Sequence, residues 1–191
     1  MDFFEIIEAR HSIRRFDQAV EVPPEAVERL LSAALLAPNA GNRQPWHFYV
    51  VRDPDLRQGL VAAARGQGFV GQAPVAIVVC ADAEQSAGRY GDRGRQLYCL
   101  QDTAAAVENI LLGAVALGFG SCWVGAFDEA EAARVLDLPP NHRPVAILPI
   151  GKPAEAPTQQ LPSPSATADK RMFSTAAAVS CRQYSSRPRC P

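Results

Sequence analysis

Residues 101–127 read QDTAAAVENILLGAVALGFGSCWVGAF, and this stretch says most about the fold. Apolar residues recur at helical spacing over residues 95–117, which predicts a long helix. Its alanines and Gly113 permit close approach of neighbouring elements, so we expect the helix to be buried and central. Gly118-Phe119-Gly120 predicts the end of that helix and the start of a strand over Ser121–Gly125. The side chains expected to face inward are Leu97, Leu100, Ala104, Val107, Leu111 and Ala114.

The segment from Ile110 to Phe127 carries no charged residue and approaches the length of a membrane-spanning helix. Gly118 and Gly120 interrupt it, and such breakers fit a helix-to-strand boundary better than a continuous span. We therefore expect no membrane segment. The N-terminus also lacks a basic segment followed by an apolar run, so no export signal is expected.

Helices and strands alternate irregularly on both sides of this stretch. Helices are predicted from Asp2, which has the capping-box spacing with Glu5, to about Ala9, then from Pro23-Pro24, and from Asp53-Pro54 to about Ala64. Asp128 and Glu131 predict a second capping box. Strands are predicted over Trp46–Val51 (buried on both faces), Val75–Cys80 and Pro144–Ile150. Four strand candidates among helices indicate an α+β domain built around one sheet.

Two segments are predicted to lack regular structure. Gln85–Arg95 is polar and contains glycine, so we expect a mobile loop or lid. Residues 154–191 are rich in proline and serine, which predicts a C-terminal arm that is extended or partly ordered. The predicted organisation is therefore one domain over residues 1–153 followed by this arm.

Composition narrows the class of protein. The chain has 191 residues, of which 48% are hydrophobic and 20% charged, as in an ordinary globular protein. Its formal net charge of −1 argues against a nucleic-acid binder. The five cysteines form no C-x-x-C pair, so neither a metal site nor a disulfide framework is predicted, and a reducing cytoplasm is the expected location.

Arg10, Ser12 and Arg14 alternate along the chain. In an extended segment such residues point to one side, where two guanidinium groups and a hydroxyl suit a phosphate group. A solvated charged turn is the alternative, because charged groups are usually on the surface without a ligand.

Asn39, Asn42 and Gln44 place three side-chain amides close to Trp46. An amide offers both a donor and an acceptor, which suits the edge of a heteroaromatic ring. The alternative is a turn whose asparagines hydrogen-bond to their own backbone.

Other motifs carry less weight. Residues 66–71 match G-x-G-x-x-G, but a helix is predicted before this segment and a strand after it, the reverse of a dinucleotide-binding context. His11, His47 and His142 are well separated and no Ser/His/Asp arrangement is apparent, so a hydrolase has little support. Cys122 is expected to be a small buried apolar residue.

Five segments in order together resemble the flavin-dependent nitroreductase family. They are residues 10–14 (RHSIR), 37–46 (APNAGNRQPW), 101–109 (QDTAAAVEN), 118–127 (GFGSCWVGAF) and 149–153 (PIGKP). The resemblance covers about residues 2–153. It implies a nitroreductase-like α+β fold with a central mixed, mainly antiparallel sheet flanked by helices and a long buried central helix. It also implies a homodimer that binds FMN at the subunit interface.

The resemblance assigns residues to the cofactor. Arg10, His11, Ser12 and Arg14 match the family's phosphate and ribityl contacts, and Lys170-Arg171 is the best match for a late basic residue that reaches the phosphate. A flavin-ring loop, usually supplied by the partner subunit, is matched by Pro38, Asn39, Ala40, Asn42 and Gln44. The backbone near flavin N5 is matched by Val124, Gly125 and Ala126. Residues 172–179 depart from the family's usual leucine- and acid-containing dimer arm.

The activity implied is hydride transfer from NADH or NADPH, through the flavin, to nitroaromatics, quinones or similar small acceptors in a ping-pong cycle. No side-chain acid or base is required for such a transfer, so no catalytic side chain is assigned. A non-catalytic flavin-binding protein and a specialised flavin reaction on the same scaffold are the alternatives.

Overall fold

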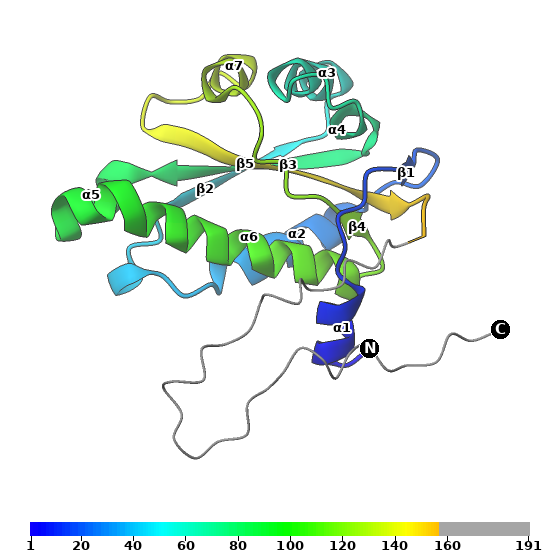
Figure 1. The fold of residues 1–191 in the computed structure, drawn as a ribbon, viewed down its shortest axis with the longest axis horizontal. Helices are drawn as coiled ribbons and strands as arrows, with labels where there is room; N and C mark the ends of the chain where they lie inside the picture. The colour runs from blue at the N-terminus through cyan, green and yellow to red at the C-terminus, as the bar shows by residue number, and fades with distance from the viewer. Residues whose placement is uncertain (157–191) are drawn as a thin grey trace, which may run out of the picture. The chain divides into compact units, whose positions relative to one another are not determined.

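The computed structural model describes residues 1–156, which form a five-stranded sheet covered by helices (Figure 1). The strands are β1 (Phe16–Asp17), β2 (Trp46–Val51), β3 (Val75–Asp82), β4 (Gly120–Ser121) and β5 (His142–Pro153). The order across the sheet is β1-β5-β3-β2, and β4 also pairs with β5. Nearly all of the predicted arm, together with Arg171, lies outside the described residues. The predicted α+β class is confirmed.

Every pairing between these five strands is antiparallel. The parallel contribution to the expected mixed sheet, within residues 1–156, is a single bridge between Ser12 and Ser121. All eight residues of β3 are buried. A strand enclosed in this way must satisfy its backbone through two neighbours, which β2 and β5 provide.

Helices cover both faces of the sheet (Figure 1). On one face lie α2 (Pro24–Leu35) and the long α6 (Cys99–Ala116), and on the other lie α3 (Pro54–Ala63), α4 (Phe69–Gln72) and α7 (Glu129–Val135). Each face has its own apolar cluster, the first around Leu30, Ile110 and Leu148 and the second around Leu60, Val78 and Ile147. The expected long, buried, central helix is confirmed as α6.

The helix starts agree with the sequence predictions in most cases. Asp2 and Glu5 form a complete capping box at α1 (Phe3–Ala9). Asp53 caps α3 and Pro24 begins α2. At α7 only half of the predicted box forms: Asp128 accepts from the Glu131 N–H, while the Glu131 carboxylate pairs with Arg134.

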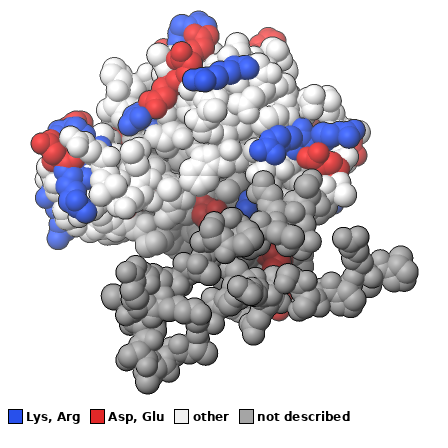
Figure 2. All heavy atoms as spheres, viewed as in Figure 1, with Lys and Arg blue, Asp and Glu red and all other residues white. Residues whose placement is uncertain are grey.

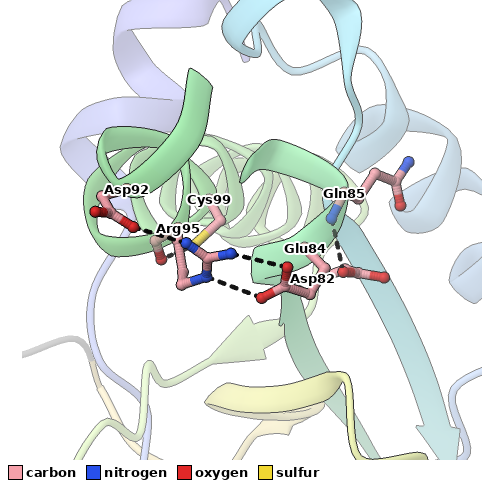
Figure 3. A network of polar contacts seen from close by, with 6 residues as sticks. All are labelled: Asp82, Glu84, Gln85, Asp92, Arg95 and Cys99. Carbon is pink, nitrogen blue, oxygen red and sulfur yellow. Dashed lines mark hydrogen bonds and ion pairs between the residues drawn. The ribbon is translucent and has the colours of Figure 1, made fainter. Parts of the chain in front are cut away.

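The loop or lid predicted for Gln85–Arg95 is wrong. The segment forms α5 (Ala83–Arg93) and leads through a π-helical turn, η2 (Gly94–Tyr98), into α6. Asp82 accepts a hydrogen bond from the Gln85 N–H at 2.9 Å, and Arg95 pairs with Glu84 and Asp92 (Figure 3). This N-cap and these ion pairs stabilise a helix whose glycines suggested a loop.

Two strand predictions also need correction. β2 is an edge strand, and Val50 is 39% exposed, so it is not buried on both faces. The strand expected over Ser121–Gly125 is shorter, because only Gly120 and Ser121 pair as a strand before an isolated bridge from Val124 to Ile147.

The uncharged segment Ile110–Phe127 is divided between α6, a turn at Gly118 (φ +77°) and β4. In the part of the chain that the structure describes, no helix combines the length and the hydrophobicity that crossing a bilayer would require. The G-x-G-x-x-G segment follows α3 and runs into α4, which begins at Phe69, so it is not a strand-to-helix loop.

Substituting Gly94 tests the packing of α5 against η2. A Cβ at Gly94 would lie 2.6 Å from the backbone oxygen of Ser86, so Gly94→Ala is expected to cost about 1–3 kcal/mol of unfolding free energy through overpacking. At Gly88 a Cβ would meet only Arg43 Nη2, at 3.5 Å, and Gly88→Ala is the matched control, expected to be neutral or stabilising by up to about 1 kcal/mol. Urea denaturation measures both. Equal stability of the two variants would contradict the packed arrangement.

Candidate functional site

The segment carrying Arg10, Ser12 and Arg14 runs between β4 and the residues that follow β5. On one side Ser12 forms a parallel bridge with Ser121, and the Ile13 N–H donates to the Ser121 carbonyl at 2.9 Å. On the other side the Glu155 carboxylate accepts from the backbone N–H groups of Arg14 (2.6 Å) and Arg15 (3.1 Å). Because the backbone is held on both sides at residues 12–15, the position of Arg14 is defined, while Arg10 follows directly on α1 through its N–H, which donates to the Ile6 carbonyl.

The side chains of this segment point outward around Cys122. Arg14 and Ser12 are exposed, and Arg10 is about one-third exposed, with its Nε 3.9 Å from Glu108. Burial raises the pKa of the Cys122 thiol, although nearby Arg14, Ser12 and Arg10 oppose that rise. The thiol is thus a neutral, buried group, as expected, and three hydrogen-bond donors gather above it.

His11 has a more local role in this chain. Its Nδ1 lies 2.9 Å from the carbonyl oxygen of Ala9, so one ring nitrogen is engaged by the backbone of the preceding helix. Its predicted contact with a cofactor therefore stays a prediction.

Val124, Gly125 and Ala126 lie immediately beyond β4 and Cys122. Val124 is buried and exchanges two backbone hydrogen bonds of 3.0 Å with Ile147, which fixes this stretch to the sheet. Gly125 and Ala126 are exposed. A Cβ at Gly125 would meet only the indole of Trp123, at 3.8 Å or more, so the surface above Gly125 is open.

The predicted amide loop folds as a 3₁₀ turn, η1 (Ala40–Asn42), with an unusual backbone. Gly41, Asn42 and Gln44 all have positive φ, and a Cβ at Gly41 would overlap the Tyr90 hydroxyl. The Asn39 amide hydrogen-bonds within the loop, accepting from the Gln44 N–H at 2.9 Å and donating to the Ala37 carbonyl at 3.3 Å. Asn39 therefore holds the turn, whereas Asn42 and Gln44 are exposed and Ala40 is half-buried.

Asp102, in the first turn of α6, supports this loop from below. Its Oδ1 accepts a hydrogen bond from the Ala40 N–H at 3.1 Å, while its buried Oδ2 has no protein partner among residues 1–156. Burial raises the pKa of Asp102, and the hydrogen bond from Ala40 offsets only part of the rise. Gln85 holds the other end of the loop through two hydrogen bonds with Arg43.

The arginine segment and the amide loop meet α6 at different places. Ala40 contacts Asp102 near the start of the helix, whereas Arg10 lies 3.9 Å from Glu108 near its middle and Ser12 pairs with Ser121 beyond its end. Since a helix rises about 1.5 Å per residue, about 9 Å along the axis separates Asp102 from Glu108, and about 20 Å separates Asp102 from the end of the helix. No hydrogen bond or ion pair within residues 1–156 joins the two groups.

The charged surface has a mixed character on the face that Figure 2 shows. Positive and negative side chains lie next to one another over α5 and α7, with largely uncharged surface between. The ion pairs Arg95–Glu84 and Arg134–Glu131 belong to these two regions. Such pairs neutralise each other. Arg10 lies at the limit of an ion pair with Glu108, at 3.9 Å, and Arg14 has no ion-pair partner among residues 1–156.

Comparison with known proteins identifies the class of this fold and site. The model of the nitroreductase family matches residues 7–68 and 62–152. The NADH dehydrogenase of Thermus thermophilus is 35% identical over 182 residues, covering 80% of this chain and 88% of the relative. A nitroreductase family protein from Clostridium novyi has a TM-score of 0.74 at 33% identity, covering 81% of this chain and 87% of that structure.

An FMN-dependent nitroreductase from Clostridium difficile is also similar, with a TM-score of 0.72 at 28% identity. The match covers 82% of this chain and 91% of that structure. The chain therefore belongs to the nitroreductase family. The resemblance identified in the sequence is confirmed, and it extends over the sheet, α6 and both predicted binding segments.

The residues present fit FMN by the chemistry of their donors. Arg10, Ser12 and Arg14 offer guanidinium and hydroxyl donors suited to a phosphate, and the open surface at Gly125 leaves room for a planar ring. Asp102, Gln85 and Glu155, which position these segments, were not predicted as site residues. Their partners are backbone groups 42 to 141 residues away, and nothing in the local sequence signals such contacts.

Substitutions at Asp102 test its support of the amide loop. Asp102→Ala leaves the Ala40 N–H without an acceptor and is expected to lower the unfolding free energy by about 1–3 kcal/mol. Asp102→Asn keeps an acceptor for the Ala40 N–H and removes a buried charge. At neutral pH its unfolding free energy should therefore equal or exceed that of the wild type.

The difference in unfolding free energy between the wild type and Asp102→Asn should change with pH in a definite direction. Because the pKa of Asp102 is raised in the folded state, proton uptake there favours folding. The wild type should therefore gain stability relative to Asp102→Asn as pH falls from neutral towards about 4. Denaturant titrations at several pH values measure this, and a difference that stays constant with pH would contradict it.

Proposed function

We propose that this protein is an FMN-dependent oxidoreductase that uses NADH or NADPH to reduce nitroaromatic, quinone or related small acceptors. The observation that carries the proposal is the set of outward donors at Arg10, Ser12 and Arg14 beside the open stretch Gly125–Ala126, in a chain of the nitroreductase family. The cofactor assignment of Arg171 remains part of the proposal and lies outside the described residues.

Each segment has a distinct role. Arg10 and Arg14 hold the phosphate through charge-assisted hydrogen bonds, with Ser12 as a further donor. When bound, FMN supplies the hydride-accepting chemistry. The backbone at Val124–Ala126 positions one edge of the ring, and Gly125 keeps the approach to it free of side chains. Asn42 and Gln44, whose amides are exposed, donate to the polar edge of the ring and stabilise negative charge there.

The complete site is formed by two copies of the chain. The arginine segment and the amide loop lie apart within one protomer, and each is exposed. Large apolar side chains are also exposed near them, including Phe4 (72%) on α1 and Leu36 (83%) before the amide loop. Large apolar side chains exposed in this way are candidates for a protein interface, and a homodimer would bring the loop of one copy to the arginines of the other.

The donor and the acceptor use the same open side of the site in turn, which gives ping-pong kinetics. The cytoplasm is the proposed location, in agreement with the free thiols of Cys80, Cys99 and Cys122.

Anaerobic titration of the FMN-loaded protein with NADH and NADPH tests the activity. Loss of the oxidised flavin absorbance supports an oxidoreductase. A flavin that stays oxidised with both nicotinamides would instead favour a non-catalytic flavin-binding protein.

Arg10→Ala and Arg14→Ala test the phosphate assignment. Each is expected to weaken FMN binding by about 1.5–3 kcal/mol, the value of a hydrogen bond to a charged group. Isothermal titration of the apoprotein with FMN measures the change. Arg134→Ala, which removes a guanidinium from the exposed pair with Glu131 on α7, is the matched control and should bind FMN normally. Unchanged affinity in both arginine variants would remove the assignment.

Leu36→Asp tests the shared site. Placing a carboxylate at this exposed apolar position is expected to convert dimer to monomer and to lower the FMN content in parallel, because the loop of the partner is lost. Leu56→Asp on α3, where the side chain is 39% exposed on the other face of the sheet, is the control. Light scattering gives the mass and absorbance gives the flavin content. A monomeric variant with full FMN content would contradict a site shared between copies.

A further inference from the structure

Three potential metal ligands from three strands meet at one end of the sheet. They are His47 on β2, Asp82 at the end of β3 and His142 at the start of β5. His47 pairs with Cys80 and Asp82 pairs with His142, so all three side chains project from the same face of the sheet. Their ligand atoms lie within 4.8 Å of one another. Sequence separation concealed this group.

The carboxylate of Asp82 is held in place. Its Oδ1 accepts from the Gln85 N–H at the start of α5 (Figure 3), and its Oδ2 accepts from Asn141 Nδ2 at 2.8 Å. The Asp82 side chain is only 10% exposed. A carboxylate fixed in this way has lost much of its freedom to move before any ligand arrives, which reduces the entropy cost of binding.

The two imidazole rings are stacked, with centroids 3.6 Å apart and planes inclined by 15°. Nδ1 of His142 lies 2.5 Å from the Tyr49 hydroxyl, which leaves Nε2 for another partner. Nε2 of His47 is buried and has no hydrogen-bond partner among residues 1–156, where the carboxylate oxygen paired with it, Asp82 Oδ2, is 3.6 Å away. A buried polar atom without a partner is rare in folded proteins and calls for an explanation.

We propose that His47, Asp82 and His142 form a binding site for a divalent transition metal ion of the zinc class. Two imidazole nitrogens and one carboxylate oxygen are a common ligand set for Zn²⁺, with water completing the coordination. Ca²⁺ and Mg²⁺ are not suited to this set because they prefer oxygen ligands. In this site the Nε2 of His47, which lacks a hydrogen-bond partner, is a ligand of the metal ion.

A small movement completes the site. Two parallel stacked rings do not direct their lone pairs at one point, so His47 turns about its Cβ–Cγ bond, a motion that the 36% exposure of its side chain permits. His142 stays in place, since its Nδ1–H donates to the Tyr49 oxygen when Nε2 binds the metal. Such a partner fixes the ring orientation of a metal-binding histidine.

An occupied site would brace the amide loop. The Asp82 N–H donates to the Pro45 carbonyl at 3.0 Å. The Asp82 side chain accepts from the N–H of Gln85, and the Gln85 side chain in turn donates to the Arg43 carbonyl. The metal thus joins the ends of three strands beside this loop and stabilises the folded state. The site is independent of the proposed flavin chemistry, because none of its three ligands belongs to the predicted FMN contacts.

Zinc titration of the full-length, FMN-loaded protein tests the proposal. Cys181 and Cys190 are replaced by serine so that C-terminal thiols cannot bind the metal. We expect one Zn²⁺ per chain and a higher melting temperature, with no comparable effect of Mg²⁺. Tyr49→Phe should weaken zinc binding about tenfold, and His47→Asn and His142→Asn should weaken it more. His11→Asn removes an imidazole elsewhere and is the matched control for zinc affinity.

NMR of the histidine ring protons in the same protein needs no ligand substitution. Zinc should shift the signals of His47 and His142 and leave those of His11 in place, even if a ligand variant fails to fold. Absence of zinc binding, unchanged affinity in folded His47→Asn and His142→Asn, or shifts confined to His11 would each overturn the proposal and leave the two rings as a structural stack. None of these results would bear on FMN binding, which is measured separately by flavin absorbance.

Discussion

The complete burial of β3 is the constraint on which the rest of the structure depends. Each of its eight residues is enclosed, so its backbone groups must pair with strands on both sides and both faces must be covered by helices. This places α6 and α2 against one face and α3 and α7 against the other. It also aligns the ends of β2, β3 and β5, which is why His47, Asp82 and His142 meet there.

The family site follows from how the chain passes around this strand. The arginine segment is held between Ser121 and Glu155, whereas the amide loop is held by Asp102 and Gln85 near the other end of α6. Neither segment is a regular element, and each depends on backbone hydrogen bonds to distant side chains. The positive φ at Gln44 indicates that the loop conformation is stabilised by these contacts, since glutamine, unlike asparagine or glycine, seldom adopts it freely.

Several polar side chains of this protein hold backbone segments in place through hydrogen bonds. Asn39 closes its own turn, Asp102 supports Ala40, and Asp82 begins α5. Binding is proposed instead for groups that point outward or lack a partner among residues 1–156, such as Arg14, Asn42 and the Nε2 of His47. No side chain in the described residues is required as an acid or base by the proposed reaction, which agrees with chemistry supplied by a cofactor.

The sequence by itself determined the class of fold, the central helix, most helix starts and the segments that identify the family. These depend on periodicity, capping residues and short motifs, all of which are local. The helix over Gln85–Arg95 depends on local contacts, the Asp82 cap and the ion pairs of Arg95 with Glu84 and Asp92, which the glycines of the segment outweighed in the sequence prediction. Only the tertiary structure decided that β2 is an edge strand and that Asp102 supports the amide loop, and it alone brought His47 to His142. Each of these three features depends on a partner far away in the chain, and a local pattern carries no information about which distant residue will satisfy a buried group.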